Sequence, residues 1–319
     1  MNILITGSSG QVGTNLSLAL LQKGITVFGI DRRDNTWTDR IPMIRRDLAR
    51  EGMPTPAELA AIAPGFDRPD LVVHLAANAK VHELVEDPAR AHENGATTFN
   101  VLEFCRRQRL PIIFSSSREV YGRPQPPTVG ENTTDVFHIL SPYAAYKMAD
   151  EMLIYSYAHC YGLKYLVFRL SNVYGRYDSD LARMTRVLHV FIDQLRQGQP
   201  VTIYGRHKMI DFTYVDDCIN GLLLGIEKLL AGEVINDTFN LSSGSPATLD
   251  QLAETVAANL GVTPQIIDEP IRPGEISFYV ADLSKAERLL GYKPQVTFNE
   301  GIKRAIEWVM AWEKQQGAR

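Results

Sequence analysis

The stretch NILITGSSGQVG, residues 2–13, decides the fold. Its first part, Asn2–Thr6, is an apolar run with β-branched side chains, which predicts a short buried strand. The turn that follows contains three glycines: Gly7, Gly10 and Gly13. A helical pattern of apolar residues runs from this turn to Gly24, and residues 25–30 predict a second strand. This order of elements predicts a βαβ unit with two parallel strands.

The glycine turn predicts a dinucleotide-binding site. Glycine lets the backbone approach a pyrophosphate, and the start of a helix offers unpaired N–H groups and the positive end of its dipole. A tight structural turn is the alternative interpretation, but the strand before and the helix after are the context that the motif requires. The candidate residues in the turn are Gly7, Gly10, Gln11, Val12 and Gly13.

The end of the second strand bears on the choice of cofactor. Asp31 lies there, where a carboxylate can accept hydrogen bonds from an adenosine ribose and disfavours a 2′-phosphate. We therefore expect NAD. Arg32 and Arg33 could instead pair with a 2′-phosphate, so NADP stays the alternative, although both arginines also fit a solvated surface.

Strands and helices go on alternating after this unit. Further strands are expected at 41–47, 70–77, 110–117 and 164–170, and helices at 54–64, 87–108 and 142–161. This alternation predicts an α/β fold with a doubly wound, Rossmann-like parallel sheet. Small residues end the strand at 70–77, as is needed where a cofactor crosses close to the backbone, and His74 before them is expected to be a buried, hydrogen-bonded strand residue.

The alternation of strands and helices becomes less regular after residue 175. We expect a helix at 183–197 and a strand at 200–204. Residues 211–217 start a new segment with a helix that runs to about 230, and a strand at 238–241 returns to the first sheet. Helices at 249–260, 284–290 and 300–314 complete the chain. The sequence thus predicts two interleaved domains. A dinucleotide-binding domain comprises 1–172 and 211–243, and a smaller α/β substrate domain comprises 173–210 and 244–319.

Composition excludes several classes of protein. The 319 residues carry a net charge of -4, so there is no basic footprint for a nucleic acid. Three scattered cysteines lack the spacing of a metal site or a disulfide framework, which favours a reducing compartment. No charged leader or long apolar span stands out. We expect a cytoplasmic protein with no metal and no membrane contact.

A tyrosine and a lysine four residues apart form the candidate catalytic pair. Ser141 and Pro142 suit the cap and first turn of a helix, which puts Tyr143 and Lys147 on one face. A phenol has a pKa of about 10, and a neighbouring ammonium is expected to lower that pKa. The run Ser115–Ser117 ends a buried strand and can supply a hydroxyl beside the phenol. Taken alone, the pair is also an ordinary amphipathic spacing.

Collected in order, the motifs of the chain resemble those of the extended short-chain dehydrogenase/reductase superfamily, in its nucleotide-sugar epimerase/dehydratase branch. The resemblance covers nearly the whole chain. It rests on Gly7-x-x-Gly10-x-x-Gly13, Asp31, His74-Leu75-Ala76-Ala77, Asn94, Ser115-Ser116-Ser117, Val120-Tyr121-Gly122, Tyr143-x-x-x-Lys147, Arg169-x-x-Asn172-x-Tyr174-Gly175, Asp211-Phe212-x-x-Val215-Asp216-Asp217 and Arg272-Pro273-Gly274-Glu275.

The resemblance implies roles for individual residues. Tyr143 looks like the base that takes a proton from a sugar hydroxyl, Lys147 like the ligand of the nicotinamide ribose, and Ser117 like the hydroxyl that orients the C4 oxygen. Besides the glycine turn and Asp31, NAD binding is implied for Asp47, Leu48, Leu75, Ala76, Ala77, Asn94, Ser115, Tyr143 and Lys147. Nucleotide-sugar binding is implied for Ser117, Asn172 and Arg272, and a homodimer through the helices near Asp87 and Pro142.

The chain departs from the family pattern in two places. The family usually has an arginine before its Asp-Phe pair as a second clamp on the diphosphate, and Ile210 stands there. Arg206 or Lys208 could replace it, or both could be solvated loop residues. The second departure is Arg118-Glu119, where dehydratases usually carry Asp-Glu. Glu119 is a candidate acid or base for elimination or decarboxylation, or a structural hydrogen-bond partner.

We therefore expect an NAD-dependent nucleotide-sugar epimerase that oxidises C4 transiently and returns the hydride. A decarboxylase or dehydratase that uses Glu119 after the same oxidation is the alternative. A non-catalytic, NAD-binding sensor is a third possibility, which the presence of Ser117, Tyr143 and Lys147 disfavours.

Overall fold

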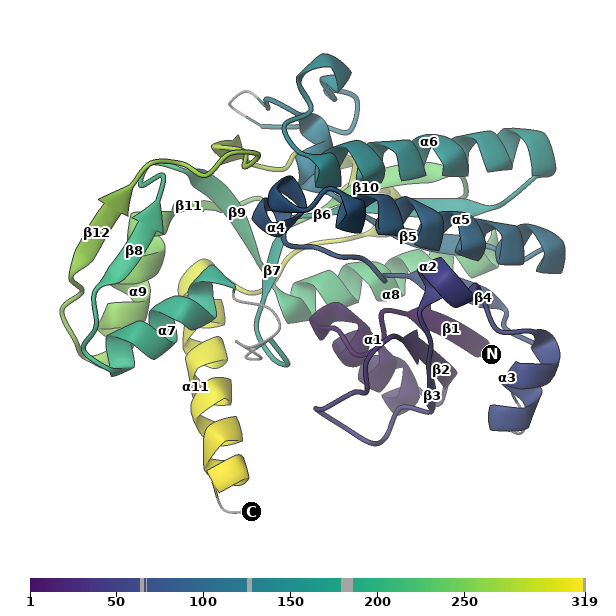
Figure 1. Ribbon diagram of the computed structural model, residues 1–319, viewed down its shortest axis with the longest axis horizontal. Coiled ribbons are helices and arrows are strands. Elements are labelled where there is room, and N and C mark those ends of the chain that lie inside the picture. The colour runs from purple at the N-terminus through teal and green to yellow at the C-terminus, as the bar shows by residue number, and fades with distance from the viewer. Residues whose placement is uncertain (64–65, 67, 125–127, 179–185, 318–319) are drawn as a thin grey trace.

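Seven strands form one parallel sheet in the order β10-β6-β5-β4-β1-β2-β3 (Figure 1). The structure is a computed structural model that describes residues 1–317 except 64–65, 67, 125–127 and 179–185. The strands are β1 (Asn2–Thr6), β2 (Thr26–Asp31), β3 (Met43–Arg45), β4 (Leu71–His74), β5 (Ile112–Ser117), β6 (Tyr165–Leu170) and β10 (Asp237–Leu241). The strand order reverses between β1 and β4, which is where ligands of such sheets bind, beyond the carboxyl ends of the strands.

Helices cover both faces of this sheet (Figure 1). One face packs on α1 (Gln11–Gln22), α8 (Val215–Ala231) and α10 (Ser284–Leu290). The other face packs on α2 (Leu48–Glu51), α3 (Pro56–Ile62) and α5 (Ala89–Gln108), with α6 (Pro142–Tyr161) and the short α4 (Val81–Glu86) beside α5. The predicted doubly wound parallel sheet is therefore confirmed.

Smaller sheets and three helices stand beyond the carboxyl ends of the main strands. Strand β9 (Met209–Tyr214) pairs with β7 (Asn172–Tyr174), β11 (Pro246–Thr248) and β13 (Phe278–Tyr279), and β8 (Val201–Tyr204) pairs with β12 (Ile266–Glu269). The helices are α7 (Val187–Arg196), α9 (Leu249–Leu260) and α11 (Phe298–Gly317). Two 3-10 turns, η1 (Arg118–Tyr121) and η2 (Val136–His138), lie between β5 and α6.

Most expected elements are present, with three corrections. The strand expected at 70–77 ends at His74 as β4, so the small residues after it lie in a loop. The strand expected at 41–47 shortens to β3, because Asp47 caps α2 by accepting from the Ala49 N–H at 3.0 Å. The segment that starts at 211 contains an unexpected strand, since residues 209–214 form β9 and the helix starts at Val215. Five of the six residues of β9 are buried, and a short apolar run of this kind does not distinguish a strand from a helix. Residues 64 and 183–185 of the expected helices lie outside the described residues.

The described part of the chain also bears on membranes, metals and disulfides. It contains no helix that is long and apolar enough to cross a membrane. Nor do those residues include a group of three or more His, Cys, Asp or Glu side chains that could hold a metal ion. Cys105, Cys160 and Cys218 are free thiols, of which Cys105 and Cys218 are buried and Cys160 is exposed.

Candidate active site

Two adjoining cavities lie where the main sheet meets the smaller sheets. The larger has a volume of about 610 Å³ and the smaller about 200 Å³. They share part of their walls, because Val12, Leu75, Ala77 and Lys80 line both. A ligand in one cavity therefore lies against a ligand in the other.

The glycine turn forms one wall of the smaller cavity, and its glycines are sterically required. Gly7 has a φ of +74°, and a Cβ there would lie 2.7 Å from the backbone nitrogen of Ala76. A Cβ on Gly13 would lie 2.2 Å from the carbonyl oxygen of Gly7. Helix α1 starts beside them with no side-chain cap and no acidic residue in its first turn. Its free N–H groups and positive dipole end fit a pyrophosphate.

The residues predicted to bind NAD lie around these two cavities. All except Ser115, Tyr143 and Lys147 line the smaller cavity, and these three line the larger one. Asn94 also shapes the loop after β4, since its side chain accepts from the Asn78 N–H at 2.7 Å and donates to the Asn78 carbonyl at 3.0 Å. The donor set and the glycine cradle fit a dinucleotide that runs from the smaller cavity to the larger.

The carboxylate of Asp31 has structural contacts in addition to its place in the wall of the smaller cavity. Its oxygens accept from the backbone N–H groups of Ser9 and Arg33, both at 3.0 Å, so it stabilises the glycine turn as well as lining the cavity. Arg32 donates to Asn78 at 2.7 Å and lies 3.9 Å from Glu93. These contacts give Arg32 a partner within the protein.

Tyr143 lies at the first turn of α6, which begins as predicted. Ser141 caps the helix by accepting from the Ala144 N–H at 3.2 Å, and Pro142 occupies its first position. The phenol is buried and hydrogen-bonds with Ser117. Burial raises the pKa of Tyr143 to about 12, although the hydrogen bond to Ser117 opposes this. The prediction that the pKa of Tyr143 lies below that of an ordinary phenol is therefore wrong for the protein without a bound ligand. Desolvation of the phenol outweighs the effect of the charges nearby.

Lys147 reaches from α6 to the main sheet. Its Nζ donates to the carbonyl oxygen of Ser115 at 2.7 Å and lies 4.5 Å from the centre of the Phe114 ring. Burial lowers its pKa to about 8, and the charges of Asp150 and Glu151 act in the opposite direction. The ammonium is thus held at the end of β5, in the wall that also carries Ser117.

The residues predicted to bind substrate divide into two groups. Ser117, Asn172 and Arg272 line the larger cavity, and the Arg272 guanidinium stacks 3.8 Å from the centre of the Tyr204 ring. Arg206 lies outside the lining of both cavities, with its Nε 2.6 Å from Asp250. Ile210, in place of the usual arginine, is buried in the cavity wall, and Lys208 lies there with it. The structure therefore offers Lys208, rather than Arg206, as the nearby cation.

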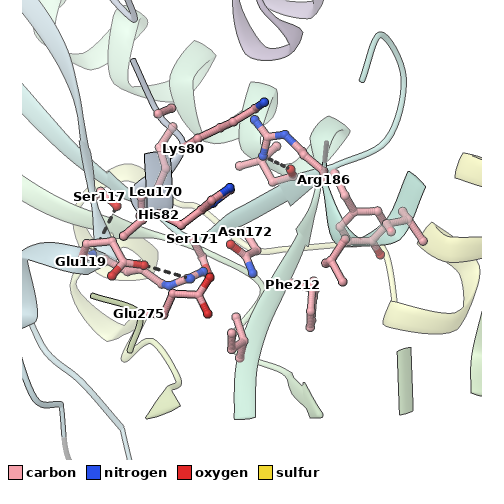
Figure 2. Close-up of a pocket in the computed structure, with 18 of the residues that line it drawn as sticks. Lys80, His82, Ser117, Glu119, Leu170, Ser171, Asn172, Arg186, Phe212 and Glu275 are labelled. Atoms are coloured by element: carbon pink, nitrogen blue, oxygen red, sulfur yellow. Dashed lines mark hydrogen bonds and ion pairs between the residues drawn. The ribbon is translucent and has the colours of Figure 1, made fainter. Parts of the chain in front are cut away.

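Glu119 is not a free carboxylate. It is buried in η1 and pairs with Arg118 at 3.0 Å, and its own N–H donates to Ser117 Oγ at 3.2 Å. Burial raises the pKa of Glu119, while the cations Arg118 and Lys208 lower it. Both members of the pair line the larger cavity, and Figure 2 shows Glu119 on the side of Ser117.

Two further cations, Lys80 and Arg186, were missed by the sequence analysis. Each of them lines the smaller and the larger cavity, and Figure 2 shows their side chains among those that line the pocket. Lys80 pairs with Glu83 at 2.7 Å, and Arg186 pairs with Asp178 at 2.8 Å and donates to the Val173 carbonyl. Neither belongs to a recognisable motif, so only the fold reveals them.

Comparison with known proteins identifies the family. The model of the NAD dependent epimerase/dehydratase family matches residues 3–268. UDP-glucuronate 4-epimerase 1 of Arabidopsis thaliana is 31% identical over 98% of this chain and 77% of its own length. UDP-glucose 4-epimerase of Thermotoga maritima superposes with a TM-score of 0.87 at 28% identity, covering 98% of this chain and 100% of that one.

A second solved structure agrees. UDP-glucuronic acid 4-epimerase of Bacillus cereus, in complex with UDP-glucuronic acid and NAD, has a TM-score of 0.86 at 27% identity and covers 98% of this chain and 100% of that one. The resemblance predicted from the motifs is confirmed. The chain belongs to the NAD-dependent epimerase/dehydratase family and is an NAD-dependent enzyme of the nucleotide-sugar epimerase type.

Proposed function

We propose that the protein inverts C4 of the sugar in a UDP-sugar, with Tyr143, Ser117 and Lys147 as the residues at the reacting carbon. The observation that carries this proposal is their convergence in the wall of the larger cavity, next to the cavity that fits the rest of a dinucleotide. The UDP moiety is taken from the similar epimerases of Arabidopsis thaliana and Thermotoga maritima.

The residues around Tyr143 suit it to move a proton at the sugar O4. The Ser117 hydroxyl bonds to the phenol and can hold O4 beside it. NAD, when bound, supplies the hydride acceptor, and its cationic nicotinamide favours the phenolate. Lys147 is held at the end of β5, where it can donate to a ribose hydroxyl. Because the site is buried, little water competes for these contacts.

The surroundings of Glu119 favour return of the hydride over elimination or decarboxylation. A base that acts at C5 must be free to take a proton, whereas Glu119 is held by Arg118 at 3.0 Å. The residue before it is this arginine, which cannot donate a proton as an acid would. The 4-keto sugar is then expected to turn over and be reduced on its other face.

Product analysis tests the proposal. The protein with NAD is incubated with UDP-glucose and, separately, with UDP-glucuronate, and the products are examined by mass spectrometry and proton NMR. We expect a product of unchanged mass in which the C4 proton has the opposite configuration. A product that has lost water or carbon dioxide would contradict the proposal, and so would the absence of any product from either sugar.

We also propose a homodimer and a cytoplasmic location. Large apolar side chains are exposed on the two neighbouring helices α5 and α6: Phe99, Met152, Leu153 and Tyr161. A second copy would cover them through a four-helix contact of the kind that the family resemblance implies. The location is supported by the three free cysteines, which are typical of a reducing compartment.

A further inference from the structure

Four charged side chains gather at the Ser117 end of the larger cavity. We name Arg118, Glu119, Lys208 and Glu275 the charged quartet. Arg118 pairs with Glu119 at 3.0 Å, and Lys208 pairs with Glu275 at 2.6 Å. The two pairs are near enough to interact, since the charges of Lys208 and Glu275 both act on the pKa of Glu119. All four line the cavity.

The quartet lies beside the reacting carbon of the proposed function. The charges of Glu119 and Arg118 both act on the Tyr143 phenol, and the Glu119 N–H donates to Ser117 Oγ. Figure 2 shows Glu119 and Glu275 on the same side of the pocket, near Ser117. Groups attached to the sugar next to C4, on C3 or C5, would therefore meet the quartet first.

Polar atoms in this wall are left without protein partners. Arg118 Nε and Ser116 Oγ are buried and have no hydrogen-bond partner among the described residues, and both residues line the cavity. The side chains of the Arg118–Glu119 pair are only 11% and 6% exposed. The Arg118 N–H can only donate and the Ser116 hydroxyl can donate or accept, so a sugar hydroxyl, which does both, can bond to either atom.

We propose, on the basis of the proposed function, that the charged quartet selects a neutral, hydroxylated hexose and rejects a hexuronate. The quartet holds two cations and two carboxylates, so its formal charges cancel. A sugar hydroxyl can donate to a carboxylate and accept from Arg118 or Lys208 at once. A sugar carboxylate can only accept, and the two cations that could donate to it are already paired with Glu119 and Glu275. It would therefore compete with these two carboxylates as a third negative charge. Like charges placed side by side in a desolvated site disfavour binding.

The wild-type enzyme gives the first test. With NAD bound and at pH 8, kcat/KM is measured for UDP-glucose and for UDP-glucuronate. We expect UDP-glucose to be preferred by about 10- to 100-fold. A preference for UDP-glucuronate would overturn this inference while leaving the epimerase proposal intact. Absence of C4 inversion with both sugars would instead overturn the proposed function.

Variants of the charged quartet test whether it causes the preference for UDP-glucose over UDP-glucuronate. Glu275→Gln and the double change Glu119→Gln/Glu275→Gln remove the repulsion and leave two cations facing the sugar. We expect kcat/KM for UDP-glucuronate to rise relative to UDP-glucose, by about 10-fold or more in the double variant. Glu313→Gln is the matched control, because Glu313 pairs with Arg196 outside both cavity walls.

The control variant Glu313→Gln should keep the wild-type ratio of kcat/KM for UDP-glucuronate to kcat/KM for UDP-glucose. Glu275 has 21% of its side chain exposed, so its single variant retains a test if the more buried Glu119 is needed for folding. A ratio that stays at the wild-type value in folded Glu275→Gln and in the double variant would contradict the assignment.

Discussion

Tyr143 illustrates how burial and catalysis oppose each other at a single residue. The spacing to Lys147 suggests a phenol with a lowered pKa, but the structure raises it to about 12, mainly by desolvation. The proton therefore stays on the phenol until further charge enters the site. This makes the reactivity of Tyr143 depend on the bound cofactor, which a sequence pattern alone does not reveal.

Removing the phenol oxygen tests the role of Tyr143. Tyr143→Phe should fold and bind NAD but lose at least ~100-fold in kcat, because a positioned acid–base group contributes that much. Tyr146→Phe is the matched control on the next turn of α6, where the hydroxyl lies 2.9 Å from His92 instead. Turnover and NAD binding are measured for both variants. Near-native turnover by Tyr143→Phe would remove Tyr143 from the mechanism.

At the scale of elements, a buried hydrogen-bond chain joins two strands to two helices. Thr6 on β1 bonds to His74 Nδ1 at 2.7 Å, and His74 Nε2 lies 3.2 Å from the Thr98 hydroxyl on α5. Thr98 then donates to Asp150 on α6 at 2.9 Å. The interpretation of His74 as a buried, hydrogen-bonded strand residue is confirmed.

The burial of His74 within this chain of hydrogen bonds makes the free energy of unfolding depend on pH. Burial, with the Lys147 charge adding to it, lowers the pKa of His74 to about 3. In the unfolded chain His74 has a pKa of about 6.5. Below that pH the unfolded chain binds a proton at His74 that the folded protein does not, so the free energy of unfolding falls as pH falls. From pH 7 to pH 5 the loss due to His74 should be about 2 kcal/mol.

Urea unfolding of the wild type and His74→Gln at both pH values measures this loss. The variant should be less stable at pH 7 but should lose about 2 kcal/mol less between the two values. His138→Gln, at an exposed histidine of η2, should follow the wild type. Equal pH dependence in the wild type and His74→Gln would contradict the account, because it would mean that His74 has the same pKa in the folded and the unfolded protein.

At the scale of the whole molecule, local signals predicted the main sheet, and distant contacts decided the rest. The unit from Asn2 to Asp31 carries its strand, turn and helix signals within one stretch, and α6 begins where Ser141 and Pro142 predict. The short strand β13, by contrast, exists only because Phe278 and Tyr279 meet β9 from far along the chain. The domain division itself stays a prediction.

The candidate site follows the same rule. The residues around the glycine turn and α6 could be predicted because each belongs to a motif with a local geometry. Arg206 and Lys208 lie two residues apart and have the same sign, yet one pairs with Asp250 outside the cavities and the other lines the larger cavity. Which cation faces the cavity depends on the conformation of the turn between β8 and β9, so the sequence could not decide between them.

The central claim is that the hydride removed from C4 returns to C4. UDP-glucose carrying deuterium at C4 tests it most directly, with the reaction run in ordinary water and the epimeric product examined by NMR and mass spectrometry. We predict that the product keeps the deuterium at C4 and has unchanged mass, because the hydride passes to the cofactor and back. Deuterium found at C6 with loss of water, or replaced at C4 by solvent hydrogen, would contradict the account.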